Sequence, residues 1–156
     1  MEQAPKPAAA PKPKSKTMWI VAAVIIIIVV IAGVYYAFYA NPAPKYAVSI
    51  LDDNACAPNA AACKFDSNAI TVPSGNSVVW TNKGNVAHTV YSCDSQNSPS
   101  TQACPNGNNQ GAAANVHIAS STLNGGQTFQ FKFDTAGAYQ YYCSIHLWMH
   151  ANVTVT

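Results

Sequence analysis

The first forty residues divide into two parts with opposite patterns of polar and apolar positions. Residues 1–17 are mostly proline, lysine and alanine and show no hydrophobic period, so this segment is predicted to be a disordered tail. Residues 18–40 then run without a single charged side chain. A helix of this length would measure about 34 Å, enough to cross the ~30 Å hydrocarbon core of a bilayer. The pattern therefore predicts one transmembrane anchor over residues 18–40.

A cleaved signal peptide is the alternative interpretation of the same apolar segment. Such a peptide has an apolar region of roughly 7–15 residues and small side chains just before the cleavage site. Here the apolar run is longer, and cleavage after Ala40 or Ala37 would place the bulky Phe38 or Tyr35 at the third position before the cut. We therefore favour an uncleaved anchor.

The distribution of lysine predicts the orientation of this anchor. Four lysines (6, 12, 14 and 16) precede the apolar run, and only Lys45 follows soon after it. By the positive-inside rule the N-terminus is cytoplasmic, and the rest of the chain lies outside the cell membrane after a single pass. Residues 41–45, Asn-Pro-Ala-Pro-Lys, are predicted to form a short, stiff linker.

Beyond residue 45 the pattern changes to short β-rich runs separated by turn residues. In residues 128–133 three phenylalanines alternate with Gln130 and Lys132, the period of two expected of a strand with one buried face. Many short strands without a helical segment predict an all-β domain over residues 46–156, a Greek-key antiparallel β-sandwich. The expected strands are Tyr46–Leu51, Ala69–Val72, Ser77–Asn82, Ala87–Ser92, Val116–Ser120, Thr128–Phe133, Tyr139–Cys143 and Asn152–Thr156.

The charge of this part of the chain argues against one class of partner. From Lys45 onward there are four lysines and five aspartates, which gives a net charge near −1, and arginine is absent from the whole sequence. A nucleic-acid-binding protein needs a basic face that neutralises phosphates. We therefore expect no nucleic-acid partner.

Five cysteines in a domain outside the cytoplasm invite disulfide formation. Cys56 and Cys63 enclose one short loop, and Cys93 and Cys104 enclose a polar loop. Two local disulfides would leave Cys143 unpaired. The sequence leaves other pairings among the first four cysteines open.

The richest chemistry lies in the stretch Cys143-Ser-Ile-His146-Leu-Trp-Met149, which places a thiolate, an imidazole and a thioether within seven residues. Two histidines and one cysteine with a weak axial methionine form the ligand set of one-electron copper sites. His88 is the candidate for the second histidine. The alternative is a strand that ends in a buried cysteine, with the histidine and methionine as ordinary core and loop residues.

Ordered blocks over residues 69–155 make the copper interpretation more specific. The chain resembles the type 1 (blue) copper proteins of the cupredoxin family, in the style of plastocyanin, amicyanin and halocyanin. The upstream blocks are Ile70-Thr-Val-Pro-Ser-Gly75, Val78-Val-Trp-Thr-Asn82 and Val86-Ala-His88-Thr-Val90, and the downstream blocks are Gly126-Gln-Thr-Phe129, Phe133-Asp-Thr-Ala-Gly-Ala-Tyr139 and Tyr142-Cys-Ser-Ile-His-Leu-Trp-Met149.

This resemblance implies a cupredoxin-like fold that binds one type 1 copper ion. It implies His88, Cys143 and His146 as trigonal ligands and Met149 as the weak axial ligand. It also implies that Thr89 and Ser144, each of which follows a ligand, brace the site through hydrogen bonds.

The function expected from this ligand set is single-electron transfer between a redox protein that donates and one that accepts. Leu147 and Trp148 flank His146 and would form an apolar docking site. The alternative is a copper redox enzyme acting on a small molecule such as nitric oxide, if Met149 leaves the axial position open. His150 is the only evident general acid or base beside the loop, which favours the electron carrier over the enzyme.

Overall fold

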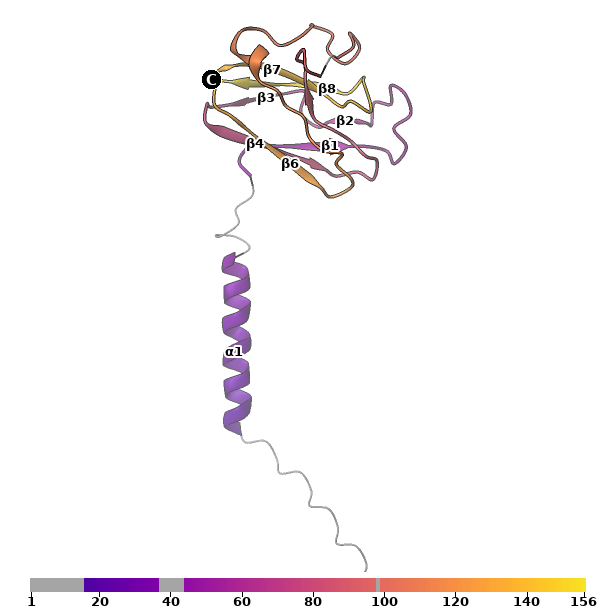
Figure 1. Ribbon diagram of the computed structural model, residues 1–156. Helices are drawn as coiled ribbons and strands as arrows, with labels where there is room; N and C mark the ends of the chain where they lie inside the picture. Colours follow the sequence, from indigo (N-terminus) through magenta and orange to yellow (C-terminus); the bar gives the residue numbers. More distant parts are fainter. Residues whose placement is uncertain (1–15, 37–43, 98) are drawn as a thin grey trace, which may run out of the picture. The chain divides into compact units, whose positions relative to one another are not determined.

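The computed structural model describes residues 16–36, 44–97 and 99–156 (Figure 1). The chain forms two compact units, Met1–Ala43 and Pro44–Thr156. Residues 1–15 of the predicted tail (1–17) and residues 41–43 of the predicted linker lie outside the described residues.

The first unit contains one apolar helix, α1, which spans Lys16–Tyr35 and has no buried residue. Its 20 residues make a helix about 30 Å long. By length and composition α1 could cross a membrane, although a signal sequence near an N-terminus has the same properties. The helix begins at Lys16, two residues before the predicted start, and the predicted residues 37–40 lie outside the described part of the chain.

The second unit is a sandwich of two four-stranded sheets, which form the two layers in Figure 1. The fold predicted from the sequence is thereby confirmed. One sheet has the order β2-β1-β4-β6 and the other the order β3-β8-β7-β5. The strands are β1 Ala47–Leu51, β2 Lys64–Phe65, β3 Ala69–Val72, β4 Asn76–Asn82, β5 Tyr91–Ser92, β6 Thr128–Phe133, β7 Gly137–Tyr142 and β8 His150–Val155.

The pairing within the sheets differs from the expected antiparallel pattern in two places. Strands β1 and β4 are parallel, and so are β3 and β8, whereas the other named pairs are antiparallel. Parallel partners need a long crossover connection. Here β2 and β3 lie between β1 and β4 in the sequence, and β4 to β7 lie between β3 and β8. Each sheet is therefore mixed.

The predicted strand Val116–Ser120 does not form, because serine hydroxyls replace two of the backbone acceptors of its ladder. Two backbone bonds remain, from the N–H of Ser92 to the carbonyl of Ile118 and from the N–H of Ser120 to that of Val90. The backbone N–H of Ile118 donates to Ser92 Oγ at 2.7 Å, and the N–H of Val90 donates to Ser120 Oγ at 2.9 Å. Such side-chain bonds compete with a regular ladder. Only an isolated bridge between Tyr91 and Ala119 remains, and the predicted strand over residues 87–92 is reduced to β5.

Two short elements were not expected from the sequence. Strand β2 pairs antiparallel with β1 after the loop that Cys56 and Cys63 enclose. A 3₁₀ helix, η2, spans Gly111–Asn115 in the polar segment before the bridge residue Ala119.

The core between the sheets is built around Trp80 of β4. Its ring lies 5.3 Å from that of Tyr141 on the opposite sheet, in an edge-to-face arrangement that aromatic pairs favour. The Phe65 ring of β2 lies 4.7 Å from the same tyrosine ring, also edge-to-face. Strand β4 then ends at Asn82 and β7 at Tyr142, so the sheets deliver the segments that carry His88 and Cys143.

Candidate metal centre

The two segments that approach each other at the site are fixed by different parts of the sandwich. Cys143 directly follows the last residue of β7. His88 is held by two backbone hydrogen bonds to Leu123, its N–H donating at 3.0 Å and its carbonyl accepting at 2.8 Å. Both side chains are fully buried. The backbone therefore sets the positions of the imidazole and the thiol before any ligand binds.

Three donor atoms converge at this point. The distance from Cys143 Sγ is 3.7 Å to His88 Nδ1 and 3.6 Å to His146 Nδ1, and the two nitrogens lie 3.2 Å apart. A point equidistant from all three lies about 2.0 Å from each, close to the ~2.0–2.1 Å and ~2.3 Å of zinc–imidazole and zinc–thiolate bonds. The arrangement has the size of a trigonal site for a first-row transition metal.

The loop from Cys143 to Met149 is closed by its own backbone. The N–H of His146 donates to the carbonyl of Cys143 at 3.2 Å, and the N–H of Met149 donates to that of His146 at 2.9 Å. The N–H of Cys143 donates to the carbonyl of Met149 at 3.0 Å and completes the ring. His146 is 7% exposed and Met149 is buried in the core. The loop is therefore a rigid unit that presents its side chains from a fixed frame.

Hydrogen bonds brace the sulfur of Cys143 as the resemblance implied. The backbone N–H of Thr89 donates to Cys143 Sγ at 3.4 Å, and Thr89 Oγ1 lies 3.8 Å from the same sulfur. Thr89 Oγ1 also accepts from the N–H of Ser144 at 2.8 Å and contacts Ser144 Oγ at 2.9 Å. These contacts also tie the ligand loop to the segment of His88.

The electrostatics of the site favour neutral histidines. Burial lowers the pKa of His88, and the nearby His146 lowers it further, while Asp52 opposes both effects. Burial also lowers the pKa of His146. A neutral imidazole keeps one nitrogen lone pair free for a metal. Both rings are therefore in the metal-binding form at neutral pH.

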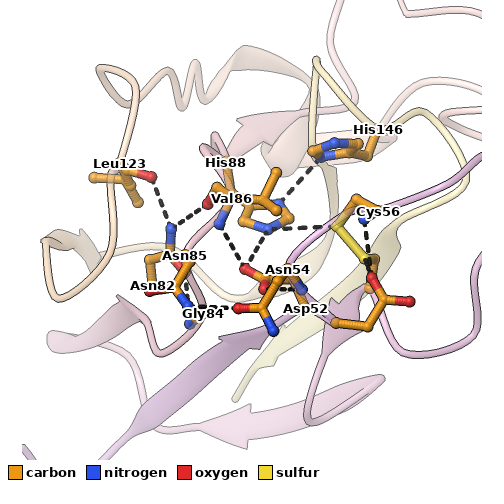
Figure 2. A network of polar contacts seen from close by, with 12 residues as sticks. Asp52, Asn54, Cys56, Asn82, Gly84, Asn85, Val86, His88, Leu123 and His146 are labelled. Atoms are coloured by element: carbon orange, nitrogen blue, oxygen red, sulfur yellow. Dashed lines mark hydrogen bonds and ion pairs between the residues drawn. A yellow bond between two sulfur atoms is a disulfide. The ribbon is translucent and has the colours of Figure 1, made fainter.

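The other nitrogen of His88 faces a carboxylate that the sequence did not single out. His88 Nε2 lies 3.6 Å from Asp52 Oδ2, and both side chains are inaccessible to solvent (Figure 2). Burial would raise the pKa of Asp52, but backbone N–H donors from Val86 and Asn54 outweigh this effect and lower it. Asp52 lies 36 positions before His88, and no motif spacing connects the two. Only the parallel pairing of β1 with β4 brings them together.

A disulfide also lies against His88. Cys56 Sγ is 3.9 Å from His88 Nε2 and forms, with His88 and His146, a buried group of the size that holds a metal ion. Cys56 is bonded to Cys63, however, so its sulfur is not available as a thiolate. The second disulfide joins Cys93 to Cys104. The expected local pairing is thus confirmed, and Cys143 is the free cysteine of the described residues.

The surface beside His146 differs from the expected docking site. Ile145 is 48% exposed, whereas Leu147 and Trp148 are half-buried. Leu147 packs against the second disulfide, and the Trp148 ring lies edge-to-face on His146 at 5.3 Å. The docking site predicted from the sequence did not include Ile145, although this apolar residue directly precedes the predicted ligand His146. The most exposed apolar side chain next to the site is therefore Ile145.

A cleft of ≈ 370 Å³ opens on the Met149 side of the site. Trp148, Met149 and His150 form one part of its lining, with Lys64 and Gln140 elsewhere along it. His88, Cys143 and His146 do not line this cleft. A small molecule in it would therefore meet the side of Met149 first.

The remaining two histidines lie in other surroundings. His117 Nδ1 contacts Asp94 Oδ2 at 3.1 Å, in a network with Ser92. His150 is exposed and begins β8, directly after Met149.

Comparison with known families identifies the second unit. Residues 54–156 match the family described as copper binding proteins, plastocyanin/azurin family. A chloroplastic plastocyanin of Tetradesmus obliquus is 30% identical over 82 residues, which cover 53% of this chain and half the length of that protein. A plastocyanin of Scenedesmus fuscus is 26% identical over 92 residues, which cover 59% of this chain and 84% of that protein.

Solved structures support the same assignment. A purple cupredoxin from Nitrosopumilus maritimus superposes with a TM-score of 0.53 and 27% sequence identity, covering 72% of this chain and all of that one. The amicyanin of Paracoccus versutus gives a TM-score of 0.53 at 20% identity, covering 74% of this chain and 85% of the other. The second of these shows likeness of fold alone.

Proposed function

Because the chain belongs to the plastocyanin/azurin family of copper-binding proteins, we propose that its second unit is a type 1 copper domain that carries single electrons. His88, Cys143 and His146 are the proposed trigonal ligands of one copper ion, and Met149 is the proposed axial ligand. The protein would accept an electron from one redox protein and deliver it to another.

The observation that carries this proposal is the convergence of the three donor atoms in a buried place. The contact of His88 Nε2 with Asp52 favours the tautomer with its proton on Nε2, so that Nδ1 presents a lone pair. That lone pair lies 3.2 Å from His146 Nδ1 and 3.7 Å from Cys143 Sγ. Lone pairs so close together repel one another unless a proton or a metal cation lies between them. The donor set of two imidazoles and a thiolate is the one that copper prefers in such sites.

Copper bound there would supply one-electron chemistry between Cu(I) and Cu(II). The residues of this chain contribute rigidity, because the backbone bonds of the 143–149 loop and the Thr89–Ser144 contacts hold the donors in place. A fixed donor geometry keeps the nuclear rearrangement during electron transfer small. Burial of the site also excludes water, which leaves the donors of the protein as the ligands available.

The cleft beside Met149 is consistent with a carrier. Met149 is among its lining residues and the three trigonal ligands are not. A redox enzyme for a small molecule such as nitric oxide would need the axial position open. The test of Met149 described in the Discussion distinguishes these two functions.

We further propose that α1 is a single-pass anchor with a cytoplasmic N-terminus, which keeps the copper domain at the outer face of the cell membrane. The length and composition of α1, together with the lysines that precede it, support this topology. Redox partners would dock over His146, through Ile145 at the centre with Leu147 and Trp148 at its sides. This proposal extends the expected docking site by one residue.

The experiment that tests the copper site is the visible and electron paramagnetic resonance spectrum of the copper-loaded protein. Wild type should show an intense thiolate-to-copper absorption. Cys143→Ser should abolish it, because serine offers no thiolate. His150→Ala is the matched control for His146→Ala: the first should keep the absorption and the second should lose or alter it. Colour that persists in Cys143→Ser would refute the ligand assignment.

A further inference from the structure

The side chain of Asp52 is a buried carboxylate, and among the described residues its partner at ion-pair distance is a histidine rather than a lysine. Asp52 follows the last residue of β1, and its side chain is inaccessible to solvent. Asp52 Oδ1 accepts from the N–H of Asn54 at 2.8 Å, and Oδ2 accepts from the N–H of Val86 at 2.9 Å. These bonds fix the carboxylate between the strand end and the segment that leads to His88 (Figure 2).

The backbone around Asp52 leaves space for this carboxylate and for little else. A Cβ atom built on Gly84 would lie 1.7 Å from Asp52 Oδ2 and 2.1 Å from its Cγ. Only a glycine at position 84 therefore accommodates the carboxylate where it is. The turn that carries Gly84 is itself held by Asn82, whose buried side chain accepts from the N–H of Gly84 and donates to the carbonyl of Val86.

Burying a charged carboxylate is costly unless a compensating charge lies close by. Among the described residues, the group at ion-pair distance from Asp52 is His88, at 3.6 Å between Oδ2 and Nε2. That distance is long for a hydrogen bond but short for an electrostatic contact. A neutral histidine alone compensates the charge poorly. A cation on the opposite nitrogen of the same ring would compensate it better.

The rest of the loop keeps Asp52 in this position. Asp53 Oδ1 accepts from the N–H of Cys56 at 2.9 Å, and Cys56 is joined to Cys63. The disulfide sulfur of Cys56 lies 3.9 Å from His88 Nε2, so it covers the ring edge that Asp52 leaves free. Residues 52–63 thus form a cap, which we call the disulfide cap, over Nε2 of His88.

From these contacts we propose that Asp52 is a positioning residue of the metal centre. Its carboxylate, held by the disulfide cap and by the space at Gly84, fixes the tautomer and the orientation of His88 and lowers the reduction potential of the bound metal. The inference rests on the proposed copper function, because it takes Nδ1 of His88 to be a ligand.

The effect on the potential follows from charge. With one thiolate ligand, the Cu(II) site carries a net positive charge and the Cu(I) site carries none. A negative carboxylate behind the ligand ring therefore stabilises the oxidised state more than the reduced state. The negative charge also favours the tautomer of His88 with its proton on Nε2, which leaves Nδ1 free to face the metal.

Asp52→Asn is the substitution that tests this proposal, because it preserves shape and one oxygen acceptor while removing the charge. Asp134→Asn is the matched control. Asp134 is 66% exposed, pairs with Lys132, and follows Phe133, which pairs with Asn76. That is the end of β4 opposite to Asn82, roughly 20 Å away along the strand. The full-length protein would be loaded with copper in mild detergent and examined by voltammetry and electron paramagnetic resonance.

We expect Asp52→Asn to raise the reduction potential and to change the copper hyperfine splitting, and Asp134→Asn to change neither. Equal potentials in the two variants would overturn the proposal. If Asp52→Asn does not fold, the wild-type Cu(I) protein still decides the question by nitrogen-15 nuclear magnetic resonance. His88 should then show a slowly exchanging Nε2–H proton, and rapid exchange of that proton would overturn the proposal.

The outcome also separates this inference from the function on which it rests. A wild-type protein that binds copper with the thiolate absorption but shows no effect of Asp52→Asn refutes the role of Asp52 and leaves the copper site intact. A wild-type protein without that absorption refutes both.

Discussion

Removing each disulfide in turn should separate its effect on stability from its effect on the copper site. Cys56–Cys63 and Cys93–Cys104 close loops with sequence separations of 7 and 11 residues. The loop-entropy relation then gives contributions of about 2.5 and 2.8 kcal/mol to the free energy of unfolding. All four cysteines are buried, so replacement by alanine leaves a comparable small cavity at each pair. The two double variants should therefore be destabilised almost equally.

Their effects on copper should nevertheless differ. Cys56–Cys63 lies against His88 Nε2 and holds the disulfide cap, whereas Cys93–Cys104 packs against Tyr142 and Leu147. Cys56→Ala/Cys63→Ala should shift the reduction potential and the copper hyperfine splitting, and Cys93→Ala/Cys104→Ala should shift them much less.

Urea denaturation of the metal-free proteins in mild detergent measures the stabilities, and voltammetry and electron paramagnetic resonance report on the copper site. A difference in unfolding free energy well above 1 kcal/mol would refute the loop argument. Identical copper spectra in both double variants would show that the disulfide cap does not position His88.

Three further outcomes are expected. Met149→Leu should raise the reduction potential and keep the colour, because loss of a weak donor disfavours Cu(II) more than Cu(I). An unchanged potential in this variant, together with azide binding to the wild-type protein, would instead favour a copper redox enzyme. The protein should sediment with membranes, with the chain from Lys45 onward open to protease from outside, and recovery of a soluble, N-terminally trimmed form would indicate a cleaved signal peptide. Asp94 has a lowered pKa, because hydrogen bonds from Ser92, Asn97 and His117 outweigh burial, which would raise it. Its ionised form therefore stabilises the fold above the unfolded pKa of about 3.9, and this stabilisation is lost as the pH falls through the lower folded pKa. Asp94→Asn should cost about 1–3 kcal/mol at neutral pH and progressively less below pH ~4 in urea titrations, and a cost independent of pH would contradict this account.

The sequence predicted those parts of the fold in which side-chain period and burial agree. Strands β3 and β6 have the predicted bounds, and exposed positions alternate with more buried ones along both. Where serine side chains compete for backbone partners, as Ser92 does for the N–H of Ile118, the same kind of pattern predicted a strand that does not form. Propensity alone does not reveal such competition.

The residues of the candidate site also fall into those that the sequence predicted and one that it did not. Cys143, His146 and Met149 are close in sequence, so one short motif brought them together. His88 is distant in sequence, and the resemblance to a family strengthened its choice as the second histidine; the structure places its Nδ1 3.7 Å from Cys143 Sγ. Asp52 could not be predicted, because its role depends on a parallel strand pair and on the missing side chain of Gly84. Long-range packing of this kind leaves no periodic signal.

The parallel pairing of β3 with β8 sets the order of events during biosynthesis. Ala69 pairs with Asn152, so β3 must wait for a partner that the ribosome makes 83 residues later. At ~5–20 residues per second this interval is about 4–17 s. The 143–149 loop is synthesised immediately before β8, so the complete donor set exists only when the last strand is about to be inserted. A nascent chain therefore cannot present the whole donor set to a metal ion until residue 149 has been synthesised.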